Sequence, residues 1–124
     1  MDAVFIGGLL HDIGRSRTHN IDHAVVGARI ALENGLSETL VNIIERHIGA
    51  GVCREEAVTL GLPEKDYLPV TIEEKIVAHA DNLAFGERIG TLDELVKSLR
   101  KKGLDEKIIH RIVGLNNEII SMIC

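Results

Sequence analysis

Helix start and stop signals recur along this chain and leave little room for a β-sheet. Glycine follows three apolar runs, at Gly14, Gly35 and Gly49, which is typical of helix ends. Ser37 has the character of an N-cap, and two Thr-x-x-Glu pairs beginning at Thr71 and Thr91 have capping-box spacing. No segment alternates apolar and polar residues as a strand would. The pattern predicts helices over about residues 2–12, 22–34, 37–47, 53–60, 71–85, 91–102 and 105–124, with loops over 15–20 and 61–69.

These signals predict an all-α fold, a bundle of about six to seven helices in one domain over residues 1–124. Hydrophobic residues make up 45% of the chain and aromatic residues only 2%, so aliphatic side chains and alanine must fill the core. The net charge of −5 argues against nucleic acid as a partner, and an anionic substrate would need a local cation.

The chain also carries signs of an intracellular protein. Cys53 and Cys124 lie far apart and outside any metal-binding spacing, so we expect reduced thiols. The N-terminus lacks the features of a secretory signal, and no apolar run approaches the ~20 residues of a membrane span. The expected location is therefore the cytoplasm, in soluble form and without membrane association.

Several ionisable residues fall on predicted apolar helix faces. His47 lies in a stripe with Val41 and Ile44, and His23 lies one turn before Gly27, a residue that leaves room for another helix. Asp81 lies at one edge of the stripe formed by Ile76, Val77, Ala80, Leu83 and Ala84, and His79 at the opposite edge. Taken singly, each residue has an ordinary interpretation. A buried histidine is usually satisfied within the core, and an aspartate at a helix edge meets solvent.

Taken together, five residues form a set of nitrogen and oxygen donors at inward positions or helix ends: His11, Asp12, His23, His47 and Asp81. Burying an unpaired carboxylate costs several kcal/mol, and a divalent cation is a partner that the whole set could share. The set includes no thiolate, which favours a catalytic site over a structural zinc site. Mn, Fe, Co, Ni, Zn or Mg are all compatible, with one or two ions. His19, in the polar loop, and His110 fall outside this set, and His79 is expected to pack or to face solvent.

The segments "HDIGR", "HAVVGA", "ERHIG" and "EEKIVAHADNL" resemble, in this order, the HD-domain superfamily of metal-dependent phosphohydrolases. The resemblance covers about two thirds of the chain and implies an all-α core. It implies that His11 and Asp12 are the central metal-binding pair, with Asp12 able to bridge two metals, and that Asp81 is the distal ligand. His23 and His47 resemble the extra ligands of two-metal members.

Arg15 stands where related proteins often have lysine, so the resemblance implies a contact with the substrate phosphate; Lys75 is a weaker candidate. HD domains usually have another histidine on a helix upstream of the HD pair, whereas the ten residues before His11 include none. The expectation is either an internal start or a missing ligand. An internal start would imply loosely held metal and self-association through the exposed apolar residues Val4, Phe5 and Ile6.

The expected function is hydrolysis of a phosphomonoester or phosphodiester, with a phosphorylated small molecule, such as a nucleotide, as the substrate. Asp12 would position the nucleophile and Arg15 would offset phosphoryl charge, so these two are the expected catalytic residues; His19 is a weak candidate for proton delivery. The alternative is a catalytically degenerate HD domain that binds a nucleotide or a protein partner. A purely helical interaction module is a third reading.

Overall fold

The computed structural model describes residues 2–123, and these residues form seven α-helices, one 3₁₀ helix and one two-stranded hairpin. The α-helices are α1 (Asp2–Leu10), α2 (His23–Glu33), α3 (Glu38–Glu45), α4 (Arg54–Leu60), α5 (Ile72–Asn82), α6 (Leu92–Lys101) and α7 (Glu106–Ile123). The 3₁₀ helix η1 spans Ile13–Ser16, and the hairpin pairs β1 (Ala84–Phe85) with β2 (Arg88–Ile89) in antiparallel register. The all-α expectation is confirmed.

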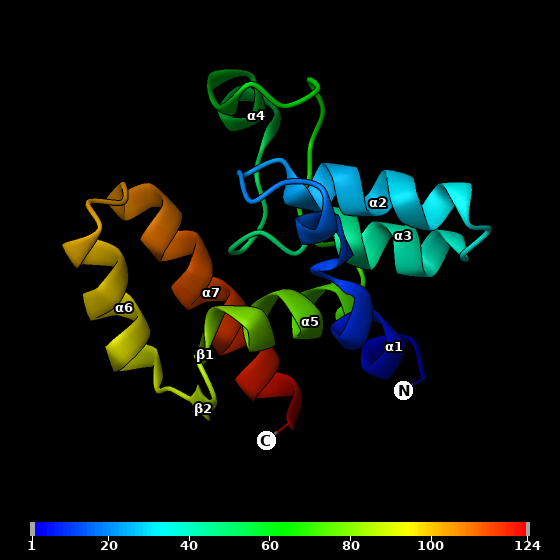
Figure 1. Cartoon of the computed structure of the whole chain (residues 1–124). Helices are drawn as coiled ribbons and strands as arrows, with labels where there is room; N and C mark the ends of the chain where they lie inside the picture. The colour runs from blue at the N-terminus through cyan, green and yellow to red at the C-terminus, as the bar shows by residue number, and fades with distance from the viewer. Residues whose placement is uncertain (1, 124) are drawn as a thin grey trace.

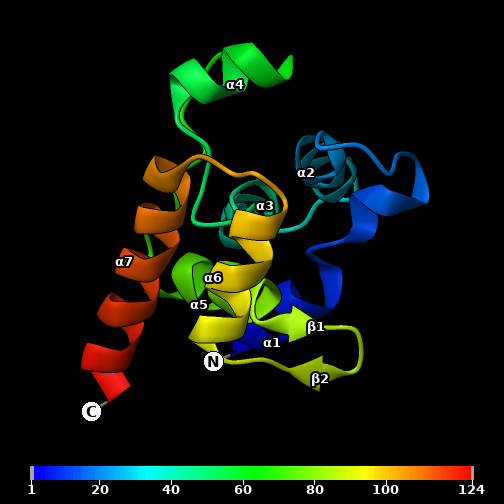
Figure 2. The same cartoon turned by 90° about the vertical axis from the view of Figure 1, so that its left-hand side faces the viewer.

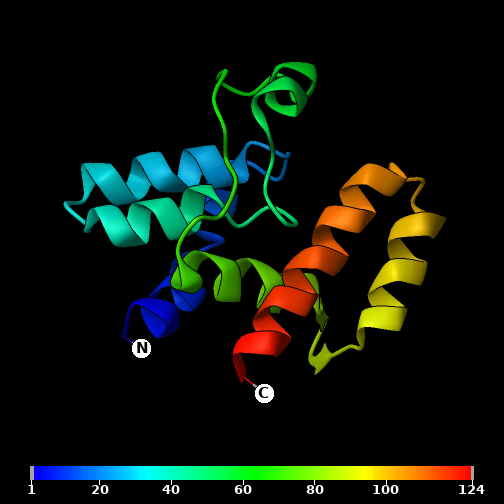
Figure 3. The same ribbon diagram turned by 180° about the vertical axis from the view of Figure 1, so that it is seen from behind.

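Two helix pairs flank α5. In Figure 1, α2 and α3 run side by side at the right, and α6 and α7 form a second pair at the left. Figure 3 shows the same arrangement from behind, with α5 between the two pairs and α1 against the end of α5. The short helix α4 stands apart from the others at the top of Figure 2, while the β1–β2 hairpin leads from α5 into α6.

Three small clusters, aliphatic except for Tyr67, make the core. Ala28, Ala31 and Ile44 join α2 to α3. A second cluster joins α5, α6 and α7 and contains Ala50, Ala78, Leu95, Ile112, Leu115 and Ile119. The third surrounds α4 and contains Val52, Ala57, Leu62 and Tyr67. The aliphatic core that the composition predicts is thus distributed between the helix pairs.

Helix boundaries differ from the predicted ones mainly where candidate ligands lie. The first helix ends at Leu10 and not at Asp12, and the third ends at Glu45 and not at His47. Part of the predicted 15–20 loop belongs to η1. The fifth helix ends at Asn82, and a hairpin that the sequence did not predict follows it, with Gly86 in the left-handed region at φ 62°.

Capping and burial bring further corrections. Thr91 and Glu94 form the predicted capping box, whereas at α5 only Thr71 caps its helix, because Glu74 bonds to Val70 N–H and Arg46 instead.

The buried face of α5 contains Glu74, Val77, Ala78 and His79, while Ala80 and Ala84 of the predicted stripe are exposed. His79 packs inside and bonds through Nε2 to Asn116 Oδ1 at 2.8 Å.

Some apolar residues remain at the surface. Phe5 and Ile6 of α1 are 70% and 40% exposed, as expected, whereas Val4 is half-buried; Leu9, which was not predicted, is also 70% exposed. None of the described helices combines the length and apolar character needed to cross a membrane. Cys53 is a free thiol, and the expectation for Cys124 lies outside the described residues.

Candidate metal centre

All five predicted ligands meet at one point of the fold, and each lies at or beside a helix end. His11 and Asp12 form the turn after α1, His23 is the first residue of α2, and His47 follows the end of α3. Asp81 lies in the last turn of α5. Helix ends carry backbone groups without helical partners, and side chains at these positions can bond to them.

The three histidines use the same local bond to fix their rings. Each imidazole donates from Nδ1 to the carbonyl oxygen of the residue three positions earlier, and the pairs are His11–Gly8 at 2.6 Å, His23–Asn20 at 3.0 Å and His47–Ile44 at 2.6 Å. A carbonyl oxygen only accepts, so the Nδ1 hydrogen is committed and a neutral ring presents a lone pair at Nε2. In metal-binding histidines, the ring nitrogen that does not bind the metal usually donates a hydrogen bond in this way.

The lone pairs of His23 and His47 face each other. Their Nε2 atoms lie 3.1 Å apart, and Asp12 Oδ1 lies 3.4 Å from each of them. Asp12 Oδ1 is buried and has no hydrogen-bond partner within residues 2–123. With neutral rings, no hydrogen lies between these three acceptors, so a cation is what the arrangement lacks.

A second group lies next to the first. His11 Nε2 is 3.2 Å from Asp81 Oδ1 and 3.5 Å from Asp12 Oδ2. The donors therefore form two sets, His11 with His47 and Asp81, and Asp12 with His23 and His47. The carboxylate of Asp12 contacts both sets, one oxygen toward each. His47 belongs to both, although its one available nitrogen can bind only one ion.

The donor spacing fits a divalent metal. Metal–nitrogen and metal–oxygen bonds of ~2.0–2.2 Å allow two ligands of one ion to lie up to ~4.2 Å apart. The measured contacts of 3.1–3.5 Å fall within that limit. The approach of His23 and His47 that the two-metal interpretation requires is present.

Electrostatics differ between the two sets. His47 is fully buried, and burial lowers the pKa of its imidazole, which favours the neutral form that a metal needs. The hydrogen bond to Asp81 raises the pKa of His11. Burial alone would raise the pKa of Asp81, but the bond and the charge of His11 outweigh it and lower that pKa. A proton on His11 Nε2 would therefore compete with a metal for the position between His11 and Asp81.

Close backbone packing holds the HD turn against α2. A Cβ added to Gly14 would lie 1.8 Å from the carbonyl oxygen of His23, and one added to Gly27 would lie 3.0 Å from Gly14 N. The close approach predicted at Gly27 is confirmed, because Ile13 and Gly14 of η1 and Ile44 of α3 lie against it. Gly14, predicted as a helix stop, is needed for this contact instead.

Other candidates lie outside the two donor sets. Arg15 is 45% exposed, and its Nε lies 3.4 Å from Asp12 Oδ1. His19 and His110 are exposed, and Lys75, whose side chain is 22% exposed, pairs with Glu118 of α7. The sequence did not single out Asn82, whose Nδ2 donates to Gly49 O at 3.0 Å and joins the segments after Asp81 and His47.

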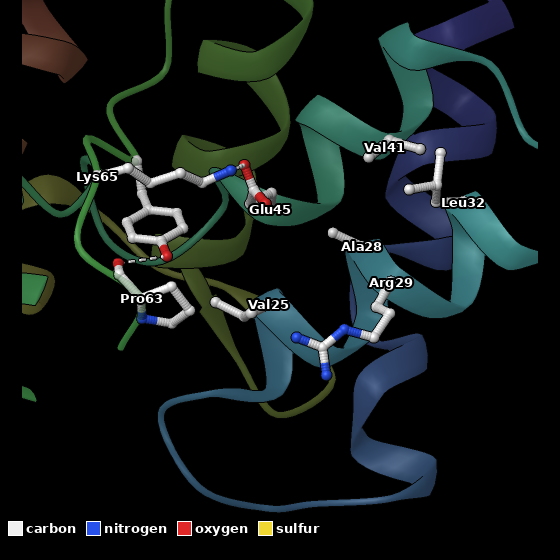
Figure 4. Close-up of a pocket in the computed structure, with 9 residues that line it drawn as sticks. Val25, Ala28, Arg29, Leu32, Val41, Glu45, Pro63 and Lys65 are labelled. Carbon is white, nitrogen blue, oxygen red and sulfur yellow. Dashed lines mark hydrogen bonds and ion pairs between the residues drawn. The ribbon is translucent and has the colours of Figure 1, made fainter. Parts of the chain in front are cut away.

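One surface groove is separate from the centre. It measures about 290 Å³ and lies between α2, α3 and the 63–67 segment. Figure 4 shows Val25, Ala28 and Val41 along it, with the Lys65–Glu45 ion pair at one side. None of the five predicted ligands lines this groove.

Comparisons with known proteins agree with the geometry. The family model described as HD domain matches residues 1–86. An uncharacterized protein of Methanocaldococcus jannaschii is 56% identical over 124 residues, which cover 99% of this chain and 73% of that protein. No solved structure matches the chain.

Two further kinds of relative carry names connected with RNA. The tRNA (cytidine(56)-2'-O)-methyltransferase of Picrophilus torridus is 52% identical over 119 residues, 96% of this chain but 35% of that protein. Ribonuclease Y of Geobacter metallireducens is 33% identical over 113 residues, 89% of this chain and 18% of that protein. The chain thus spans about a third or less of these enzymes. These names are connected with RNA, whereas the net charge led to the expectation that nucleic acid is not a partner.

Proposed function

This chain belongs to the HD domain family, and we propose that it is a phosphohydrolase that uses a divalent metal held by His11, Asp12, His23, His47 and Asp81. The observation that carries the proposal is the 3.1 Å contact between the Nε2 atoms of His23 and His47, with Asp12 Oδ1 at 3.4 Å from both. With neutral imidazoles all three atoms are acceptors, and a divalent cation among them would offset their repulsion.

The proposed reaction is hydrolysis of a phosphate ester. The oxygen of water forms a bond to phosphorus, the ester P–O bond breaks, and the leaving oxygen takes up a proton. A bound divalent metal lowers the pKa of water and offsets phosphate charge. Asp12 lies between the two donor sets and would orient the attacking water through its carboxylate.

Arg15 would bind a phosphate oxygen. Its guanidinium is half-exposed and lies beside Asp12, so its remaining N–H groups can reach an anion at the centre. Arginine stays charged at all relevant pH values, and its fixed fork suits phosphate oxygens. Asp12 belongs to one donor set and Arg15 lies beside it, which supports both catalytic assignments.

RNA phosphodiesters are a second candidate substrate. The specific observation is that relatives of this chain include proteins named tRNA methyltransferase and ribonuclease Y. A phosphodiester in RNA would need the same metal and the same two catalytic residues. The two candidates differ only in what surrounds the reacting phosphate.

The test uses the purified full chain. Elemental analysis measures bound metal, and hydrolysis is assayed with added Mn²⁺ on p-nitrophenyl phosphate, bis-p-nitrophenyl phosphate and a single-stranded RNA oligonucleotide. Metal with turnover of any of these supports the proposal, and the substrate hydrolysed decides between the two candidates. Bound metal without turnover would overturn it in favour of a degenerate binding domain. Absence of metal at saturating Mn²⁺ would overturn the metal centre itself.

A further inference from the structure

A cavity of about 470 Å³ is lined by residues that neighbour two of the proposed ligands in sequence, although none of the five ligands lines it. It is enclosed by the loop before α2, the turn after α3, helix α4, and the α6–α7 pair. Much of its wall is aliphatic, contributed by Ile21, Ile48, Leu60, Leu99, Ile108 and Ile112. Pockets that bind small molecules measure ~300–1,000 Å³ and are mostly apolar with a few polar groups, and this cavity has both properties.

The wall of the cavity begins one residue away from two of the proposed ligands. Ile48 directly follows His47, and Asn82 directly follows Asp81. Consecutive Cα atoms are ~3.8 Å apart, so the cavity and the donor sets share the same stretch of backbone. The bond from Asn82 Nδ2 to Gly49 O holds the two stretches together on the cavity side. A molecule lodged there would have to extend past Ile48 and Asn82 to bring a phosphate to the metal centre.

The polar groups at the cavity are few. Asn82 has its amide oxygen available, because its hydrogen bond to Gly49 uses the nitrogen. Lys102 forms no ion pair with any carboxylate of residues 2–123, whereas Glu56 is paired with Arg111. One cation and one amide are few polar groups for a wall that is otherwise mostly aliphatic, and they do not form the row of cations that a nucleic-acid backbone requires.

The lining also includes no aromatic side chain among the described residues. Single-stranded nucleic acid is usually held by stacking bases on aromatic rings. From this wall and its position, we propose that the cavity binds the organic group of a small phosphate ester, an uncharged and largely apolar body. This inference rests on the proposed function, and it selects small esters over RNA as the substrates.

Leu60 provides the variants that test the cavity. Its side chain lines the cavity and is 44% exposed, so changes there leave the core intact. Leu60→Trp narrows the cavity, and Leu60→Asp places a negative charge in its wall. Val58, on the same helix and 56% exposed, is outside the lining, so Val58→Trp and Val58→Asp are matched controls.

Binding is measured by calorimetry with non-hydrolysable probes in the presence of Mn²⁺, so that it does not depend on turnover. (Naphthalen-1-yl)methylphosphonate should bind about 100-fold more tightly than methylphosphonate, because burying one face and the edge of the naphthyl group removes apolar area from water. Both Leu60 variants should reduce this preference at least about tenfold, while both Val58 variants retain it.

The outcomes separate the cavity from the proposed function. Equal binding of the two phosphonates by the unmodified chain, or an unchanged preference in both Leu60 variants, would overturn the cavity assignment even if phosphate esters are hydrolysed. A naphthyl preference that depends on Leu60, in a chain that hydrolyses no ester, would support the cavity as a ligand site while the proposed function fails.

Discussion

Gly14 lies so close to His23 that a Cβ on the glycine would meet the histidine carbonyl oxygen at 1.8 Å. This contact sets how far the HD turn lies from the start of α2, and therefore whether Asp12 reaches the imidazole of His23. A methyl group at Gly14 would have to push η1 away from α2, because the atom it meets is backbone and cannot rotate aside.

We therefore expect Gly14→Ala to destabilise the fold by at least about 2 kcal/mol and to weaken metal binding together with it. Urea denaturation measures the free energy of unfolding, and elemental analysis measures the metal. Gly114→Ala on α7 is the control. Nothing lies within 4 Å of a Cβ there, so alanine should stabilise the helix by about 0.5–1 kcal/mol. A Gly14→Ala chain with unaltered stability and metal content would contradict this account of the turn.

Asp12→Ala should abolish both metal retention and hydrolysis while the fold survives. Asp12 contacts both donor sets, yet its side chain is 43% exposed, so its removal leaves the packing intact. Circular dichroism checks the fold and elemental analysis the metal. Asp93→Asn, an exposed position on α6, serves as the control. Full metal occupancy in Asp12→Ala would refute the ligand assignment.

Asn82→Ala should lower metal affinity about 10–100-fold without removing any ligand. The Asn82 amide joins the backbone after His47 to the end of α5, and so fixes the spacing between His47 and Asp81. Calorimetric titration with Mn²⁺ measures the metal affinity. Asn34→Ala breaks a comparable side-chain bond, from Nδ2 to Ile30 O at the end of α2, and should leave metal affinity unchanged. If the two variants bind metal equally well, Asn82 has no positioning role.

Acid should destabilise this protein partly through one ion pair that includes none of the proposed metal ligands. Arg111 donates to both carboxylate oxygens of Glu56, at 2.8 and 3.0 Å, and this bond lowers the pKa of Glu56 from 4.5 to about 2. The folded pKa lies below the unfolded one. The contribution of this ion pair to the free energy of unfolding is therefore complete above about pH 5 and is lost as the pH falls toward 2. Its size is about 1–2 kcal/mol, because the pair is partly exposed.

Glu56→Gln should accordingly be less stable than the unmodified chain at pH 6, and the difference should shrink by pH 2.5. The free energy of unfolding in urea at the two pH values measures it. Glu55→Gln, at the exposed neighbouring position on α4, should follow the unmodified chain at both values. A Glu56→Gln deficit that is equally large at pH 2.5 would show that the carboxylate charge is not responsible.

Self-association should depend on α1. Phe5 and Leu9 each expose 70% of their surface on a helix that is apolar on most sides. Analytical ultracentrifugation of the unmodified chain should show association that increases with concentration, and Phe5→Glu with Leu9→Glu should abolish it. Val70→Glu, at a position of similar exposure outside α1, should have no such effect. Association that persists in the α1 variant would place the contact elsewhere.

The sequence by itself determined the helices, the donor set and the family. Helix signals are local, because caps and glycine stops act within one turn, so Ser37, Thr71 and Thr91 were recognisable as N-caps from their neighbours alone. Ligand candidates could be named only as a group, since a single imidazole or carboxylate on an apolar face has an ordinary interpretation, whereas several together need a shared partner. Five such residues in order along 124 positions were enough to predict one shared site.

Only the tertiary structure decided how those five residues are arranged within the one site. α1 ends before His11 and α3 ends before His47. Both imidazoles bond to a carbonyl oxygen in the last turn of the preceding helix. At such an end, backbone N–H groups and side chains compete for the free carbonyl oxygens. The division into two donor sets around Asp12 depends on α2, α3 and α5 meeting at their ends. The contact of Gly14 with His23 and the link from Asn82 to Gly49 are likewise long-range. No local pattern encodes such distances, since they arise from packing between segments far apart in the chain.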